Sequence, residues 1–177
     1  MLILTGSPGV GKTTVLMKTV EALKKRGYSV GGMVSREVRE GGVRVGFEIV
    51  DVNSSRSGWL AHVNQKAGPQ VGKYRVNIRD LEDIGAEAIV NAVEACDIVA
   101  IDEIGPMELF SLKFKEAARK ALDSSKLVIA VVHEKTQDIL PTAAKSQKDS
   151  ETFVVTHANR EKFHENLLER AIMFLKQ

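Results

Sequence analysis

The chain has 177 residues, of which 44% are hydrophobic and 27% are charged, and its formal net charge is +2. This composition is typical of a globular protein, and the length suits one domain over residues 1–177. The small net charge argues against general nucleic-acid binding, and no apolar stretch has the length of a membrane span. With a strand predicted from Leu2, no signal peptide fits, so we expect a cytoplasmic protein without membrane association. Nothing in the sequence identifies a protein partner.

The N-terminal stretch MLILTGSPGVGKTT combines a short apolar run, a glycine-rich loop and the start of a helical pattern. Leu2–Leu4 predicts a buried strand, and the next residues fit the P-loop pattern G-x-x-x-x-G-K-[ST]. Glycines allow backbone N–H groups to turn inward around phosphates, and the positive end of the following helix favours the same anion. The predicted nucleotide-binding residues are Gly6, Ser7, Pro8, Gly9, Val10, Gly11, Lys12, Thr13 and Thr14.

Two residues of this motif have distinct predicted roles. Lys12 is expected to reach the β- and γ-phosphates and to act in catalysis. The Thr13 hydroxyl is expected to bind Mg²⁺, which is the predicted cofactor. Pro8 has no N–H and a fixed φ, so it stiffens the loop.

Residues 15–26 continue as a predicted helix that Gly27 ends, and residues 28–35 form a predicted second strand. Residues 35–52 alternate apolar and polar residues around Gly41-Gly42, which predicts an antiparallel β-hairpin. The hairpin carries Arg36, Arg39 and Arg44. These arginines either protect an edge strand from aggregation or include at least one that faces the phosphates, and the sequence leaves both open.

The middle of the chain predicts a loop over residues 53–58, short strands over 59–63 and 74–77, and an exposed turn over 64–73. A helix follows over residues 81–96. His62 has no second metal ligand at a suitable spacing, so we interpret it as a surface or hydrogen-bonded histidine. Cys96 lies among small apolar residues and is interpreted as a buried structural thiol.

A second apolar run, Ile98–Ile101, ends in the acidic pair Asp102-Glu103. Four consecutive apolar residues suit a parallel strand that helices cover on both faces. Downstream of a P-loop, this pattern is typical of a Walker B strand. Asp102 is therefore predicted to bind Mg²⁺, and Glu103 is predicted to polarise the attacking water as a general base.

The remaining pattern predicts a helix over residues 107–122, with Glu108 near its start, where a carboxylate complements the helix dipole. A buried strand over 127–132, a short helix at 138–140, a loop at 145–149 and a last parallel strand over 152–156 follow. Asn159-Arg160 opens the final predicted helix. Strands that alternate with helices predict an α/β fold, namely a three-layer α/β/α domain with a mostly parallel sheet and an added antiparallel hairpin.

Two longer motifs, DEIGPMEL at 102–109 and REVREGGVRVGFEI at 36–49, resemble the small P-loop nucleoside-triphosphatase family of thermophiles. Its vertebrate member is called cancer-related nucleoside triphosphatase. The similarity runs nearly end to end and includes GKYRV at 72–76 and the pair Asn159-Arg160, which offers loose contacts to a base or ribose. The resemblance implies Mg²⁺-dependent hydrolysis of ATP, GTP and other nucleoside triphosphates, with broad base tolerance.

A glutamate directly after the Walker B aspartate resembles the additional-strand, catalytic-glutamate division of P-loop proteins. In that division, the strand over 127–132 would lie between the P-loop strand and the Walker B strand. His133 would then stand beside the γ-phosphate, where it donates a hydrogen bond or positions the water. The alternative is a histidine that merely ends a strand.

Two other functions share these motifs. A nucleotide or nucleoside kinase would use the same donor site with an acceptor in place of water, and a slow nucleotide-dependent switch would use it to bind a partner. Kinases usually need a basic lid that shields the transfer from water. Here the arginine-bearing hairpin precedes the Walker B strand, which favours a hydrolase.

Overall fold

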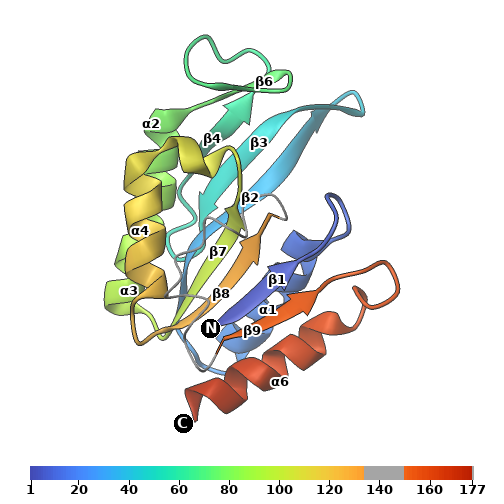
Figure 1. The fold of residues 1–177 in the computed structure, drawn as a ribbon, viewed down its shortest axis with the longest axis vertical. Coiled ribbons are helices and arrows are strands. Elements are labelled where there is room, and N and C mark those ends of the chain that lie inside the picture. Colours follow the sequence, from blue (N-terminus) through green and yellow to red (C-terminus); the bar gives the residue numbers. More distant parts are fainter. Residues whose placement is uncertain (134–149, 177) are drawn as a thin grey trace.

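The structure is a computed structural model that describes residues 1–133 and 150–176. In this part of the chain, nine strands form one sheet in the order β5-β6-β4-β3-β2-β7-β8-β1-β9 (Figure 1). The strands are β1 (Leu2–Thr5), β2 (Val30–Glu40), β3 (Val43–Asp51), β4 (Ser57–His62), β5 (Gln70–Val71), β6 (Tyr74–Val76), β7 (Ile98–Ile104), β8 (Leu127–Val132) and β9 (Glu151–Val154). The helices are α1 (Lys12–Lys25), α2 (Ile78–Asp80), a π-helical segment (Leu81–Ala86), α3 (Glu87–Ala95), a 3₁₀ turn (Glu108–Phe110), α4 (Leu112–Leu122) and α6 (Phe163–Leu175).

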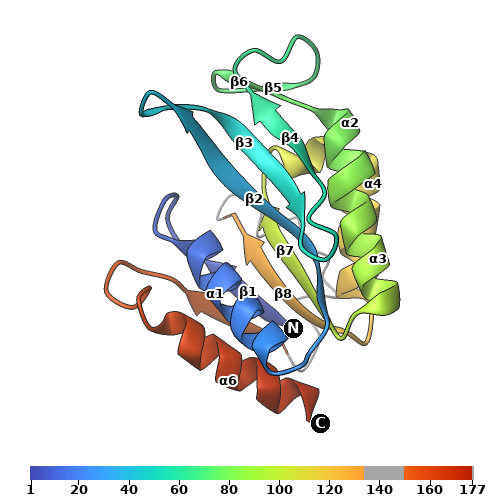
Figure 2. The same cartoon turned by 180° about the vertical axis from the view of Figure 1, so that it is seen from behind.

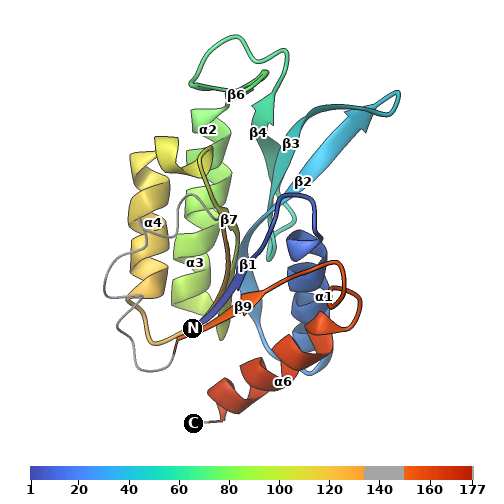
Figure 3. The same ribbon diagram turned by 45° about the vertical axis from the view of Figure 1, so that its right-hand side comes forward.

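Helices cover both faces of the parallel part of the sheet, with α3 and α4 on one side and α1 and α6 on the other (Figure 3). Each face has its own apolar core. Ile89 and Phe114 belong to the first core, whereas Leu16 and Leu167 belong to the second. Every residue of β8 is buried, as expected for a strand with helices on both sides. The predicted α/β architecture is confirmed.

The central strand order is also the predicted one. β8 pairs in parallel with β1 on one side and with β7 on the other. The carboxyl ends of these three strands therefore share one edge of the sheet. The P-loop follows β1, His133 follows β8, and the acidic pair lies in the last residues of β7. In open α/β sheets, this edge is where ligands bind.

The antiparallel part of the sheet begins at β2, which continues to Glu40 and so extends beyond the predicted strand over 28–35. Residues 30–33 pair in parallel with β7, whereas residues 33–40 pair with β3 in the predicted hairpin. Strands β4, β6 and β5 extend the sheet beyond β3 (Figure 2). The short strand β5 lies where an exposed turn was predicted, because Gln70 and Val71 pair with Arg75 and Tyr74.

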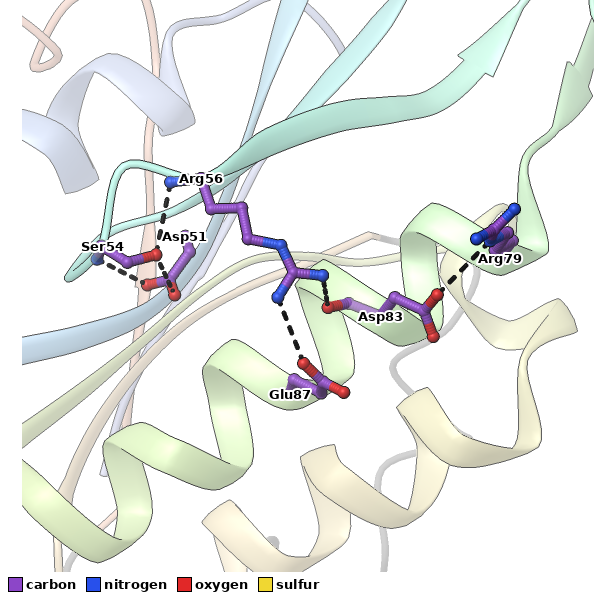
Figure 4. Close-up of polar contacts among 6 residues, drawn as sticks. All are labelled: Asp51, Ser54, Arg56, Arg79, Asp83 and Glu87. Atoms are coloured by element: carbon purple, nitrogen blue, oxygen red, sulfur yellow. Dashed lines mark hydrogen bonds and ion pairs between the residues drawn. The ribbon is translucent and has the colours of Figure 1, made fainter.

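The turn between β3 and β4 is tied to the helical layer (Figure 4). The Asp51 carboxylate accepts hydrogen bonds from the Ser54 hydroxyl (2.6 Å) and the backbone N–H of the same residue (3.2 Å). Arg56 reaches across to the helices, where it donates to the carbonyl oxygen of Asp83 (2.6 Å) and pairs with Glu87 (3.4 Å). Such exposed ion pairs stabilise a fold little, so their effect is to fix where the β3–β4 turn lies.

Two helix predictions need correction at their starts. The predicted helix over 81–96 begins at Ile78, because the Asn77 side chain caps it by accepting from the N–H of Asp80 (3.2 Å). The predicted helix over 107–122 is two elements, because the Ser111 hydroxyl accepts from the N–H of Phe114 (3.0 Å) and starts α4 there.

The C-terminal predictions shift by a few residues. The last strand ends at Val154, and the final helix begins at Phe163, after a turn that contains Asn159 and Arg160. The predictions at 138–140 and 145–149 lie outside the described residues. None of the described helices combines the length and the apolarity that crossing a membrane requires.

Candidate functional site

The loop between β1 and α1 depends on glycine. Gly6, Gly9 and Gly11 have φ angles of 141°, 76° and 110°, in a region that side chains with a Cβ rarely adopt. At Gly6 there is also no room, because a Cβ would collide with the carbonyl oxygen of Val155. These backbone angles give the loop the inward-turned conformation that the motif predicts.

Lys12 lies inside this loop. Its side chain is largely buried, and its ammonium group donates to the carbonyl oxygens of Gly6 (2.7 Å) and Ser7 (3.2 Å). The positive charge is thus held at the centre of the loop rather than projecting into water. A P-loop lysine acts on phosphates from this position.

Asp102 lies beside Thr13 at the end of β7 and is 1% exposed. Burial raises the pKa of Asp102 to about 7, although hydrogen bonds from the Thr13 hydroxyl and the Ser35 backbone N–H oppose the rise. Within residues 1–133 and 150–176, neither Oδ2 of Asp102 nor the buried Oε1 of Glu103 has a hydrogen-bond partner. Buried oxygens without partners next to a hydroxyl are the hard ligands that Mg²⁺ prefers, so Thr13 and Asp102 fit this ion.

No group of three or more histidine, cysteine or acidic side chains that could hold a metal occurs in the described part of the chain. His62 lies against Trp59, with ring centroids 4.4 Å apart, and its Nδ1 accepts from the N–H of Asn64. Cys96 is buried, and its burial raises the pKa of the thiol.

Glu108 is a site residue that the sequence reasoning assigned to a helix start. The 3₁₀ turn instead buries its side chain, which is 4% exposed. A Cβ on Gly105 would lie 3.0 Å from Oε2 of Glu108 and 3.5 Å from Oε2 of Glu103, so this glycine lets the two carboxylates approach. Burial, reinforced by the charge of Glu103, raises the pKa of Glu108 to about 8. An acidic residue inside the otherwise apolar turn Pro106–Phe110 was the available signal.

The raised pKa of Glu108 predicts that nucleotide-free protein loses stability as pH rises from about 4.5 to about 8. Between these values the folded state keeps a proton that the unfolded state has released, so raising the pH favours unfolding. Glu108→Gln removes this titration. Thermal unfolding at pH 5 and pH 8.5 should therefore show a fall in Tm that is several degrees smaller in the variant. Equal falls in both proteins would mean that Glu108 titrates normally.

A cavity of about 540 Å³ joins the P-loop, the acidic pair and the β2–β3 hairpin. Lys12, Thr13, Asp102 and Glu103 line its phosphate end. His133 also lines it, and its backbone N–H donates to the carbonyl oxygen of Ile104 (3.2 Å). The structure therefore brings together the predicted catalytic residues, which are far apart in the sequence.

The hairpin arginines differ in whether they line the cavity, and so in whether they fit a role at the phosphates or a role in protecting the edge strand. Arg36 and Arg44 line the cavity, and each is paired with a glutamate, Glu48 (3.1 Å) and Glu37 (2.8 Å) respectively. Arg39 bonds to Glu37 and to the carbonyl oxygen of Gly42 and does not itself line the cavity. The placement favours a site role for Arg36 and Arg44 and an edge-strand role for Arg39.

The pair Asn159-Arg160 lies on the other side of the P-loop. Arg160 packs beside Gly11, because its Cδ lies 3.5 Å from where a Cβ on Gly11 would be. Its Nη1 lies 3.5 Å from the carbonyl oxygen of Val10. The Asn159 side-chain amide forms hydrogen bonds within its own loop: it accepts from the N–H of Thr156 (2.8 Å) and donates to the carbonyl oxygen of Val154 (2.9 Å). Arg160 is thus positioned near the nucleotide-binding loop, whereas the Asn159 side chain is occupied.

Comparison with known proteins adds independent information. Residues 1–168 match the model of a family described as NTPase. The chain is 46% identical over 170 residues to nucleoside-triphosphatase THEP1 of Methanosarcina acetivorans, covering 96% of this chain and 95% of that protein. It is 56% identical over 133 residues to the protein of the same name from Thermofilum pendens, covering 75% and 73% of the two chains.

Two solved structures share the fold. The crystal structure of THEP1 from the hyperthermophile Aquifex aeolicus has a TM-score of 0.82 at 30% identity and covers 96% of this chain and 98% of that one. The solution structure of a human cancer-related nucleoside triphosphatase has a TM-score of 0.79 at 34% identity and covers 95% of both chains.

Proposed function

The chain belongs to the nucleoside-triphosphatase family, and from this we propose that it hydrolyses ATP, GTP and other nucleoside triphosphates to diphosphates and phosphate with the help of Mg²⁺. The observation that carries the proposal is one cavity in which the P-loop ammonium group of Lys12 meets the buried pair Asp102-Glu103. Relatives that are 46% and 56% identical to this chain are named nucleoside-triphosphatases, which supports the same reaction class.

In the proposed reaction, Lys12 neutralises charge that develops on the γ-phosphate, and the P-loop N–H groups hold the β-phosphate. Glu103 accepts a proton from water as the water oxygen attacks the γ-phosphorus. The bond from that phosphorus to the bridging oxygen breaks, and the electron pair stays on the diphosphate. Thr13 and Asp102 would hold Mg²⁺, which would supply positive charge to offset the negative charge of the phosphates.

His133 is proposed to contact the γ-phosphate or the attacking water, because it lines the phosphate end of the cavity at the carboxyl end of β8. His133→Ala should then lower kcat at least about tenfold, since it removes a contact made during the chemical step. Its affinity for ADP should not change, because ADP has no γ-phosphate. An unchanged kcat would remove His133 from the proposed site.

Base tolerance tests the substrate range. The sequence has no Asn-Lys-x-Asp signature of the kind that reads guanine in GTPases, and the Asn159 amide is occupied in its turn. Sites that discriminate strongly need dedicated polar partners for the base. Values of kcat/KM for ATP, GTP, CTP and UTP should differ by less than about tenfold when phosphate release is measured with Mg²⁺. The same measurement is then repeated with EDTA. Phosphate release should stop with EDTA. A strong preference for one base would contradict the proposed range.

A further inference from the structure

The cavity continues past the phosphate end into an apolar part that hydrolysis does not need. This part, called here the distal pocket, is lined by Phe47, Leu60, Val71, Pro106 and Met107, together with Arg44. One attacking water occupies roughly 30 Å³, whereas the whole cavity measures about 540 Å³, within the range of small-molecule sites. Water is also a poor occupant of apolar walls. The apolar walls of the distal pocket therefore suit a second ligand better than they suit water.

The donor nucleoside does not account for the distal pocket. Lys12 and Asp102 line the cavity, and phosphates bind at the start of the helix that follows a P-loop, so we place the γ-phosphate at the cavity and the α-phosphate and nucleoside beside Thr14 in the first turn of α1. Thr14 is exposed, and Arg160 packs against the neighbouring Gly11. Of the residues that the structure describes, neither Thr14 nor Arg160 lines the cavity. The distal pocket thus lies beyond the γ-phosphate, on the side from which a nucleophile attacks.

The Arg44 guanidinium group and the Phe47 ring line this part of the cavity, and Tyr74, which is not a lining residue, contacts Arg44. Arg44 donates to the Tyr74 hydroxyl (2.8 Å) and to Glu37 (2.8 Å), which fixes its plane. Its Cζ lies 5.2 Å from the ring centroid of Phe47 and 5.7 Å from that of Tyr74. Leu60 and Val71 line the same cavity and are apolar. Planar guanidinium groups and aromatic rings stack well on flat heteroaromatic ligands.

Glu103, a carboxylate that lines the same cavity, indicates the kind of group that reacts. Glu103 can accept a proton. A neutral O–H nucleophile must lose a proton when it attacks, whereas a phosphate acceptor that is already ionised need not. An alcohol in the distal pocket would meet this carboxylate in the same way as the water of the hydrolytic reaction. The base thus favours an acceptor with a hydroxyl group.

We propose that the distal pocket binds a planar heteroaromatic alcohol of nucleoside size and that the protein transfers the γ-phosphoryl group to its hydroxyl. The hydroxyl oxygen forms the new bond to the γ-phosphorus, and its proton goes to Glu103. The bond to the bridging oxygen breaks, and the electron pair leaves with the nucleoside diphosphate, so the products are a phosphomonoester and a diphosphate. The inference rests on the proposed function, since it uses the same donor site.

The direct test uses γ-³²P-labelled ATP with Mg²⁺ and millimolar adenosine, guanosine, cytidine, uridine or pyridoxine as probes. We expect at least one probe to become labelled, and the label in free phosphate to fall at least twofold relative to the reaction without a probe. Label found in free phosphate alone, with every probe, would overturn the inference and leave the proposed hydrolase intact. Absence of both products would instead count against the proposed function itself.

A matched pair of substitutions locates the acceptor. Val71→Phe fills the distal pocket, whereas Val43→Phe makes the same change at an exposed position of the hairpin outside the cavity lining. The ratio of labelled probe to free phosphate should fall at least tenfold in the first variant and stay unchanged in the second. Phe47→Ala, which removes a stacking ring instead of adding one, should lower the same ratio and serves if Val71→Phe fails to fold. Ratios that Val71→Phe and Phe47→Ala leave unchanged would overturn the assignment of the pocket.

Discussion

Replacing Lys12 by Ala is expected to lower kcat for nucleoside triphosphate hydrolysis by at least about 100-fold. The ammonium group is held in the centre of the P-loop by the carbonyl oxygens of Gly6 and Ser7. It is therefore already in place when charge develops on the γ-phosphate, and no other cation lies inside the described loop to replace it. Phosphate release at saturating Mg-ATP measures the effect.

Lys18→Ala is the matched control, because Lys18 is an exposed residue of the same helix, α1. Its removal changes the net charge by the same amount without touching the loop. We expect its kcat to stay within about twofold of the unchanged protein, as for most surface substitutions away from special features. Retained turnover in Lys12→Ala would mean that the P-loop is not the active site.

Glu103→Gln is expected to lower kcat by about 100- to 10,000-fold while Mg-nucleotide still binds, because an amide cannot accept the proton of the attacking water. Binding of a non-hydrolysable ATP analogue, measured by calorimetry, should stay within about threefold of the unchanged protein, since the amide has the same shape. This separation of chemistry from binding is what a general base predicts.

The control for this substitution is Glu116→Gln on α4, which makes the same chemical change at an exposed position outside the cavity lining. It should leave both turnover and binding unchanged. If Glu103→Gln loses binding and turnover by the same factor, Glu103 holds the metal or the fold rather than acting as a base.

The parts of the fold that the sequence predicts are those in which local pattern and burial coincide. Leu127–Val132 is apolar throughout because helices cover both faces of β8, and its place between β1 and β7 is confirmed. Gly41-Gly42 marks the hairpin turn because both residues have positive φ there. In each case the residues themselves carry the physical constraint.

Other features depend on contacts that no local pattern reveals. Glu108 has the spacing of a helix start, and only the Ser111 cap, which separates the 3₁₀ turn from α4, places it beside Glu103. All three hairpin arginines are candidates in the sequence, yet only Arg36 and Arg44 line the cavity, and Arg44 is held there by the Tyr74 hydroxyl from a different strand. Such placements follow from tertiary partners, whereas periodicity reports the faces of single elements.

The place of β1 has a consequence for synthesis of the protein. Within the described residues, the sheet neighbours of this N-terminal strand are β8 and β9, which begin at Leu127 and Glu151. During synthesis, the backbone groups of this strand therefore cannot pair in the sheet before the residues of β8 have been made. Such long-range pairing is slow, so β1 and the P-loop that follows it reach their final arrangement late in folding.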